Sequence, residues 1–258
     1  MMKALLRLLL PFAGPIFILL AWQSLAVLGG SPFFPPLQQI LEAFQKNWLF
    51  ARVGTDVIPS LTRFVYGYGS GIALGIGLGM LLGFLPTLRR ALDPVIDFVR
   101  AIPPLALIPI YLLIFGIGDT PKIIIIAWGA LFNILLNTVD GFRSMEPVMA
   151  DMARVYRLSL KDQFMMRLHW ATPQIVAGAR VALAISFILM VTSEMFASTE
   201  GIGFFVIQAQ RTFAIPDMWS GILLLGILGY VFSLVFALVE SRVTRWYRGY
   251  RSANDDRS

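Results

Sequence analysis

Long apolar runs recur along this sequence, and they limit its possible folds more than any other feature. A helix needs about 20 predominantly apolar residues to cross a hydrocarbon layer of roughly 30 Å. Runs near or above this length occur at about residues 8–29, 58–85, 95–117, 123–139, 175–196 and 219–239. We therefore predict an all-α membrane protein with six transmembrane helices. A cleaved signal peptide is the competing interpretation of the first run, which exceeds the roughly 7–15 apolar residues typical of such peptides.

Composition supports lipid as the main solvent and excludes several kinds of chemistry. Hydrophobic residues make up 57% of the chain and charged residues only 14%, against roughly 25% charged in soluble domains. The chain has no cysteine and one histidine, His169, so thiolate catalysis, histidine-metal clusters and histidine triads within one chain are excluded. No G-x-x-x-x-G-K-[ST] phosphate loop is present. We expect no enzyme activity, no cofactor and no metal in this chain.

The basic residues predict how the chain is oriented in the membrane. With the N-terminus inside, the internal segments contain Lys3, Arg7, Arg89, Arg90, Arg143, Arg154, Arg157, Lys161, Arg167, Arg242, Arg245, Arg248, Arg251 and Arg257. The external segments contain only Lys46, Arg52, Lys122 and Arg211. Cytoplasmic loops carry an excess of lysine and arginine. We therefore predict cytoplasmic N- and C-termini, and we ascribe the net charge of +6 to membrane orientation and not to nucleic-acid binding.

No repeat or soluble domain is evident, so we predict one transmembrane domain over residues 1–258. The prolines of Ser31–Pro36 favour a non-helical external connector. Residues Leu37–Phe50 then show the helical spacing of an amphipathic helix lying along the outer interface.

The second apolar run contains glycines at every fourth position, which would form one bare ridge on a helix. They are Gly67, Gly71, Gly75, Gly79 and Gly83. Such ridges allow close packing of helices in lipid. The ridge packs either against another helix of the same chain or, alternatively, across a dimer interface or against a helix that moves.

The longest polar interruption, at about residues 144–172, predicts a cytoplasmic helical hairpin. Pro147 suits the first position of a short helix, on which Val148, Met152, Val155 and Tyr156 share a face. Ser159, followed three residues later by an aspartate, resembles the capping box that starts a second short helix.

At this hairpin the sequence resembles the inner-membrane permeases of binding-protein-dependent ABC importers, whose cytoplasmic loop carries the pattern E-A-A-x3-G-x9-I-x-L-P. Asp151-Met152-Ala153 stands at Glu-Ala-Ala, and Arg157 stands at the glycine. The stretches 100–109, 115–118 and 193–203 are similar to the nitrate, sulfonate, taurine and bicarbonate branch of that family. The resemblance extends over about residues 30–240.

The resemblance implies a type I importer fold in a bacterial-type cytoplasmic membrane. It implies two permease copies, expected to be a homodimer, two cytoplasmic ATPase subunits and a periplasmic or lipid-anchored solute-binding protein. The hairpin would contain the coupling helix that docks on the ATPase. Its expected residues are Asp151, Met152, Ala153, Arg154, Tyr156, Arg157, Leu158 and Ser159.

Ionisable residues within lipid are functional candidates because they are costly there. Arg63 and Arg100 lie close enough to span ends for their side chains to extend to the interface, and Asp97 could pair with Arg100. Arg180 suggests a structural pairing or a gating role. Glu194 falls in a Glu-Met pair that the resemblance places near the translocation path, where it is expected to act as a structural or gating partner.

Asn133 and Asn137 complete the candidates for the translocation path. They lie four residues apart on the fourth apolar run, so they share a helix face that either lines a polar path or bonds to a neighbouring helix. The resemblance favours a small anion such as a sulfonate, taurine or nitrate as the solute, with vitamin precursors and aromatic acids as further candidates. The alternative hypothesis is a self-sufficient secondary transporter or channel, which would usually show discontinuous helices, internal repeats or paired mid-membrane charges; no repeat is evident here.

Overall fold

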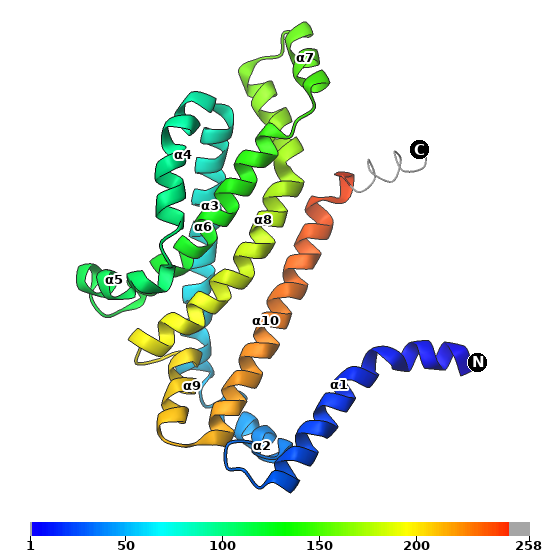
Figure 1. Ribbon diagram of the computed structural model, residues 1–258, viewed down its shortest axis with the longest axis vertical. Helices are drawn as coiled ribbons and strands as arrows, with labels where there is room; N and C mark the ends of the chain where they lie inside the picture. The colour runs from blue at the N-terminus through cyan, green and yellow to red at the C-terminus, as the bar shows by residue number, and fades with distance from the viewer. Residues whose placement is uncertain (1, 248–258) are drawn as a thin grey trace.

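The computed structural model describes residues 2–247, with side-chain surroundings from residue 13 onward except at positions 150 and 197. The predicted cytoplasmic residues Arg248, Arg251 and Arg257 lie outside this range. No strand occurs between residues 2 and 247, which confirms the all-α prediction for this part of the chain. Figure 1 shows its helices: α1 (Met2–Gly29), α2 (Leu37–Trp48), α3 (Ile58–Phe84), α4 (Pro86–Arg100), α5 (Ile108–Phe115), α6 (Asp119–Arg143), α7 (Pro147–Val155), α8 (Leu160–Ala197), α9 (Ile202–Arg211) and α10 (Ile215–Val243).

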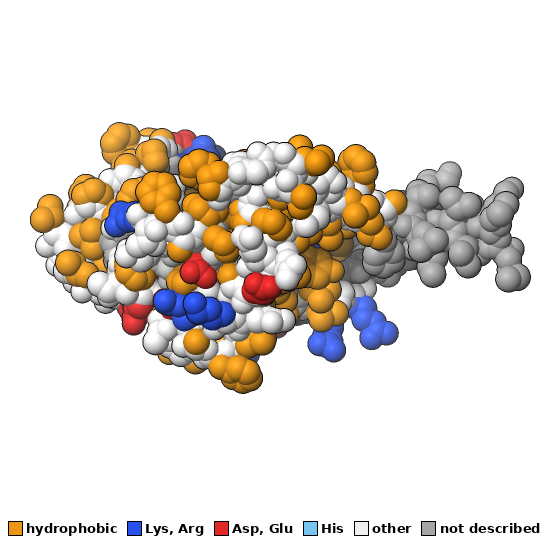
Figure 2. Space-filling model, turned by 90° about the horizontal axis from the view of Figure 1, so that it is seen from below, with side chains coloured by type: hydrophobic (Ala, Val, Ile, Leu, Met, Phe, Trp, Pro, Cys, Tyr) orange, Lys and Arg blue, Asp and Glu red, His pale blue; other side chains and the backbone are white. Residues whose placement is uncertain are grey.

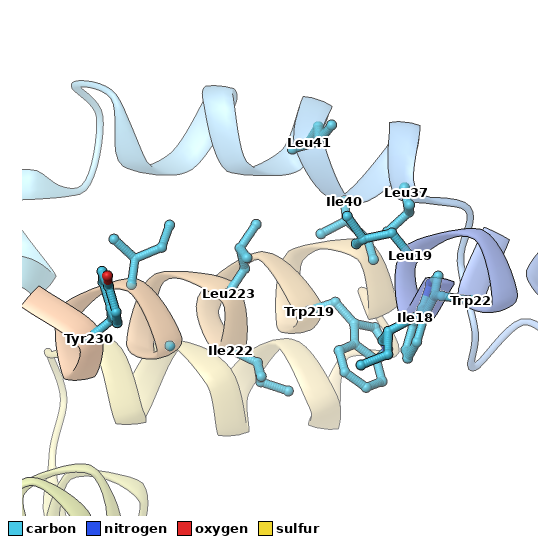
Figure 3. Close-up of a pocket in the computed structure, with 12 residues that line it drawn as sticks. Ile18, Leu19, Trp22, Leu37, Ile40, Leu41, Trp219, Ile222, Leu223 and Tyr230 are labelled. Carbon is cyan, nitrogen blue, oxygen red and sulfur yellow. The ribbon is translucent and has the colours of Figure 1, made fainter. Parts of the chain in front are cut away.

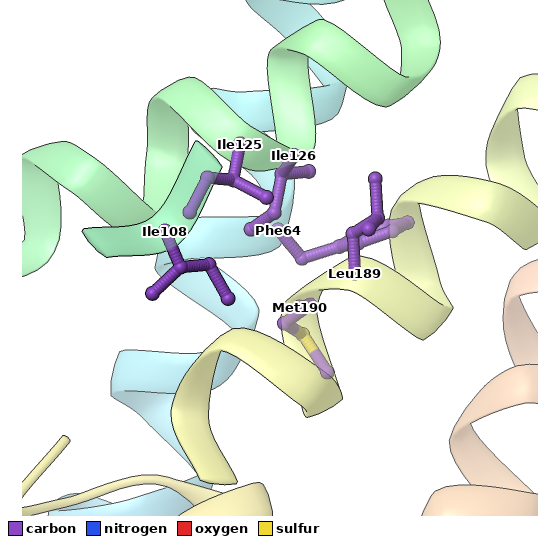
Figure 4. Close-up of a cluster of buried hydrophobic side chains, with 6 residues drawn as sticks. All are labelled: Phe64, Ile108, Ile125, Ile126, Leu189 and Met190. Carbon is purple, nitrogen blue, oxygen red and sulfur yellow. The ribbon is translucent and has the colours of Figure 1, made fainter. Parts of the chain in front are cut away.

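Helices α3, α6 and α8 form the centre of the bundle. A cluster of buried hydrophobic side chains joins them to the start of α5, and Figure 4 shows its members pointing toward one another. They are Phe64, Ile108, Ile125, Ile126, Leu189 and Met190. Burial of these side chains gives close van der Waals packing between the helices. Such packing drives helix association in lipid, where the hydrophobic effect does not.

The glycine ridge of α3 packs against α6 of the same chain, as one of the two sequence interpretations predicts. A Cβ atom on Gly71 would lie 2.5 Å from the Cβ of Ala130, and one on Gly79 would lie 2.5 Å from the Cβ of Thr138. Partners thus advance along α6 as the glycines advance along α3. The missing side chains allow the two helix backbones to approach closely.

Four helical segments between residues 2 and 247 are long and apolar enough to cross a membrane. They are Val53–Phe84, which is α3 with the π-helical turn Val53–Val57 before it, Asp119–Arg143, Leu160–Phe196 and Ile215–Val243. The pair α4 and α5 adds a fifth span if it is counted as one, and Ala13–Gly29 is a shorter apolar helix. The count of six spans therefore remains a prediction.

The third apolar run is not one continuous helix, so the sequence prediction was wrong there. Helix α4 ends at Arg100, and the chain bends by 80° before it continues to α5. Pro103 and Pro104 explain the break, because proline lacks an amide donor and disfavours a helical conformation in the residue before it.

The amphipathic helix α2 packs against the start of α10 at one end of the bundle. The indole nitrogen of Trp48 donates to Ser220 Oγ at 3.1 Å, and Asn47 donates to Asp217 at 2.8 Å. The preceding connector is non-helical, as its prolines predict. Helix α1 diverges from the bundle in Figure 1, and an apolar groove of about 720 Å³ lies between α1, α2 and α10, with Trp22 close to Trp219 (Figure 3).

Candidate functional site

The predicted hairpin lies at one end of the molecule, and α2 and α9 lie at the other (Figure 1). Helix α7 begins with Pro147 at its first position, as the sequence predicts. The predicted cap at Ser159 is also present: the backbone amide of Asp162 donates to Ser159 Oγ at 3.2 Å, while the serine hydroxyl donates to the Asp162 carboxylate at 2.6 Å.

The second helix of the hairpin is not short, which corrects the sequence prediction. It is the beginning of α8, which runs for 38 residues from Leu160 to Ala197 and contains Pro173 in its interior. Proline within membrane helices is tolerated where neighbouring helices support the freed backbone. The hairpin is therefore continuous with the central helix of the bundle.

The turn between α7 and α8 takes the left-handed conformation although a bulky residue stands at its centre. Arg157 has φ 47°, the region that glycine adopts most easily. Two backbone hydrogen bonds close this helix end. The amide of Leu158 donates to the carbonyl of Ala153 at 3.0 Å, and the amide of Arg157 donates to the carbonyl of Arg154 at 3.1 Å. This is the Schellman pattern of helix termination.

Most of the predicted coupling residues are exposed to solvent. Tyr156 is 72% exposed, and the apolar side chains of Val148, Met152 and Val155 are exposed on α7, the helix before it. Ala153 is buried at 3%. Asp151 and Arg154 form an exposed ion pair at 3.3 Å. The structure thus brings these residues together as a protruding surface of mixed apolar and charged character.

At the opposite end, Arg63 is the centre of a buried network of charges. It is 1% exposed, so the prediction that its side chain extends to the interface was wrong. Its Nε donates to Asp119 at 2.6 Å, its Nη1 to Glu194 at 2.9 Å and its Nη2 to Glu200 at 2.7 Å. The arginine stays in the bundle because three carboxylates neutralise it there.

Glu194 is fully buried and does not face an open path in this structure. Its carboxylate accepts hydrogen bonds from Ser60 Oγ at 2.7 Å and from the amide of Gly203 at 3.0 Å, in addition to Arg63. Gly201 has φ 111°, and a Cβ on it would lie 2.6 Å from the Glu194 carboxyl carbon. Only glycine fits both the conformation and the space there.

The network ties three parts of the fold together at the end that contains α9. Lys122 of α6 is also buried and donates to Ser198 Oγ at 2.9 Å, in the connection between α8 and α9. Asp119 and Glu200 remain about half exposed, at 55% and 49%. A view from this end shows acidic and basic side chains lying close together among hydrophobic ones (Figure 2).

The other path candidates lie nearer the middle of the bundle and are not brought together with Glu194. Asn133 donates to its own helix at the carbonyl of Gly129, 3.0 Å away. Asn137 accepts a hydrogen bond from Gln174 of α8 at 3.1 Å. Arg180 forms an ion pair with Glu240 of α10, which is the structural pairing considered from the sequence.

Sequence reasoning missed the roles of Ser60, Asp119 and Glu200 in the Arg63 network. The only local signal is the spacing of Asp119 and Lys122, three residues apart and 3.8 Å between charged atoms. The contacts that Ser60 makes with Glu194, and that Asp119 and Glu200 make with Arg63, join residues separated by more than fifty positions, so no spacing pattern indicates them.

Comparisons with known proteins identify the family of the chain. The profile of the family described as "binding-protein-dependent transport system inner membrane component" matches residues 71–248. The chain belongs to this family. The taurine transport system permease protein of Escherichia coli (strain K12) is 31% identical over 238 residues, which cover 89% of this chain and 86% of the relative. The bicarbonate transport system permease protein of Synechococcus elongatus is 31% identical over 250 residues, covering 92% and 90%.

The fold also matches a solved member of the ABC transporter group. A chain of the MetNI methionine ABC transporter, in an inward-facing conformation, superposes with a TM-score of 0.64 at 20% identity, covering 73% of this chain and 94% of that chain. The matched family comprises membrane transport components. The sequence predicts the same membership, from the resemblance of the cytoplasmic loop, residues 100–109 and residues 193–203. The chain is a multi-pass membrane permease of this type.

Proposed function

We propose that this chain forms the translocation path of an ATP-driven importer for a small solute bearing an oxyanion group. Two copies would form the path, two cytoplasmic ATPase subunits would drive it, and a binding protein outside the membrane would deliver the solute. Relatives named for taurine, which contains a sulfonate, and for bicarbonate support this substrate class. The proposed location is the inner membrane of a bacterium.

The observation that carries the proposal is the protruding α7 and its connection through a short turn to α8, which runs into the core. The exposed side chains of Met152 in α7 and of Tyr156 directly after it have no partner in residues 2–247 that covers them. A groove on the ATPase would bury these side chains and leave the Asp151–Arg154 pair at the rim. Since α8 continues from this turn into the centre of the bundle, a displacement of α7 would move α8 as one body.

The same proposal orients the molecule. Helix α7 and the end of α10 would face the cytoplasm, and α2 and α9 would face outward, which places both termini inside if α1 and the bent pair α4 and α5 each count as one span. The Arg63 and Glu194 network would then hold together the outer ends of α3, α6 and α8. We assign Glu194 to this closure and Asn133 and Asn137 to the wall of the path.

Co-purification tests the coupling role. The tagged permease is extracted in detergent with its genomically adjacent ATPase, as wild type and as the double variant Arg154→Glu, Tyr156→Asp. We expect the double variant to lose the ATPase, because it reverses a charge and places a carboxylate in an apolar contact. The matched control is Arg211→Glu with Phe213→Asp, which likewise reverses an arginine and replaces an aromatic residue two positions later, at exposed positions of the opposite end.

Retention of the ATPase by the double variant at the level of the control would refute the coupling assignment. Solute uptake by the permease alone, without any ATPase, would instead support the alternative of a self-sufficient secondary transporter or channel.

A further inference from the structure

A polar cleft of about 410 Å³ lies between the end of α4 and the middle of α6. It is lined by Asp97, Arg100, Ala101, Phe132, Asn133 and Leu136. The cleft combines charged, amide and apolar side chains, whereas the groove between α1, α2 and α10 is almost entirely apolar. This mixture is typical of small-molecule sites, in which a few polar groups orient the ligand.

Among residues 2–247, the cleft lies at the one place where a candidate span is broken. Helix α4 ends at Arg100, and the chain turns by 80° before α5. Irregular backbone at membrane depth is tolerated where it is buried in protein or lines a water-filled cavity, and secondary transporters bind solutes at such breaks. The break and the cleft therefore coincide, since Arg100 and Ala101 belong to both.

Arg100 has hydrogen-bonding capacity that the protein does not use. Its Nε lies 3.0 Å from the Asp97 carboxylate in an ion pair, which confirms the predicted pair, and its side chain is 49% exposed. Within residues 2–247 its two terminal nitrogens have no protein partner. Arg63, by contrast, uses all three of its nitrogens and is buried. The N–H groups of a guanidinium form a planar fork, and two of them match two oxygens of an oxyanion.

We infer that this cleft is a transient contact site for the transported oxyanion, in which Arg100 binds the anion and Asn133 forms the opposite wall. The inference rests on the proposed function. The carboxylate of Asp97 offsets the charge of Arg100, so an anion would be held weakly. Weak binding suits a path, because a solute must leave a site as readily as it enters. Phe132 and Leu136 would contact the carbon atoms of an alkanesulfonate.

The absence of cysteine from the chain permits a charge-rescue experiment. The complete complex of permease, ATPase and binding protein is reconstituted in proteoliposomes with wild-type, Arg100→Cys or Arg90→Cys permease. Uptake of labelled taurine, ethanesulfonate, nitrate and bicarbonate is measured per ATP hydrolysed. We expect Arg100→Cys to lower this ratio by about tenfold or more, because a hydrogen bond to a charged group is lost. Arg90→Cys removes the same charge from α4 outside the cleft and should retain the wild-type ratio.

Treatment with an ethylammonium thiosulfonate reagent restores a positive charge at Cys, and we expect it to restore uptake by the Arg100→Cys variant. The corresponding sulfonatoethyl reagent adds a negative charge and should not restore uptake. Wild type treated in parallel controls for cysteines of the partner subunits. Unchanged uptake by Arg100→Cys, or equal effects of the two reagents, would overturn the inference.

A second variant keeps the test decisive if Arg100→Cys does not assemble. Asn133→Asp preserves side-chain shape and adds a negative charge to the facing wall, so uptake of an anion should fall by about tenfold or more. Uptake at the wild-type rate overturns the inference and leaves the proposed function intact. ATP-driven uptake of none of the four anions by wild type overturns the proposed function, and the inference with it.

Discussion

Replacing Arg63 by methionine tests whether the buried charge network stabilises the outer end of the fold. The change keeps an unbranched side chain of similar length but removes the cation. Glu194 would then remain fully buried, with Ser60 Oγ and the Gly203 amide as its close hydrogen-bond donors. Removing one partner from a buried ion pair typically costs about 3–5 kcal/mol of unfolding free energy.

A second substitution separates lost charge balance from lost packing. In the double variant Arg63→Met, Glu194→Gln, the carboxylate that lacked a cation is neutral, so we expect most of the lost stability to return. Glu200→Gln is the control, because it breaks a contact of the same arginine where the carboxylate is half exposed. Contacts of that kind contribute about 0–1 kcal/mol.

Thermal unfolding of the detergent-purified chain, followed by tryptophan fluorescence, provides the measurement. At about 2–4 °C per kcal/mol for a chain of this size, Arg63→Met should lower Tm by about 6–20 °C. The control should lower it by about 4 °C or less. A Tm of Arg63→Met no lower than that of Glu200→Gln, or no recovery in the double variant, would refute the reasoning.

Two further predictions concern packing and backbone conformation. Gly71→Ala places a Cβ 2.5 Å from that of Ala130 and should reduce stability by about 1–3 kcal/mol. Gly77→Ala is the control, because its Cβ meets nothing within 4 Å and should not reduce stability. Equal melting temperatures of the two variants would contradict the packing of α3 on α6. At Arg157, substitution by valine should lower Tm because a β-branched residue fits the left-handed region poorly, while glycine should not. The same melting assay checks this, and a valine variant as stable as the glycine variant would count against the turn.

Local features of the sequence were sufficient to predict much of the fold. Hydropathy predicted most of the long helices because lipid selects apolar segments of sufficient length. The four-residue spacing of glycines predicted the packing ridge, and Pro147 and Ser159 predicted the start of α7 and of α8. Each of these depends on residues within a few turns of one another. The residues of the proposed coupling surface could be named for the same reason, because they lie on one continuous segment.

The tertiary structure decided which distant residues meet. Arg63 and Glu194 are separated by 131 positions, and no local pattern pairs them, so Arg63 was expected to reach the interface. The break after Arg100 and the continuity of α8 through Pro173 were likewise hidden, because a proline either ends a helix or is accommodated according to its neighbours. Hydropathy and helical spacing depend on local sequence, whereas burial and charge pairing depend on how the helices pack.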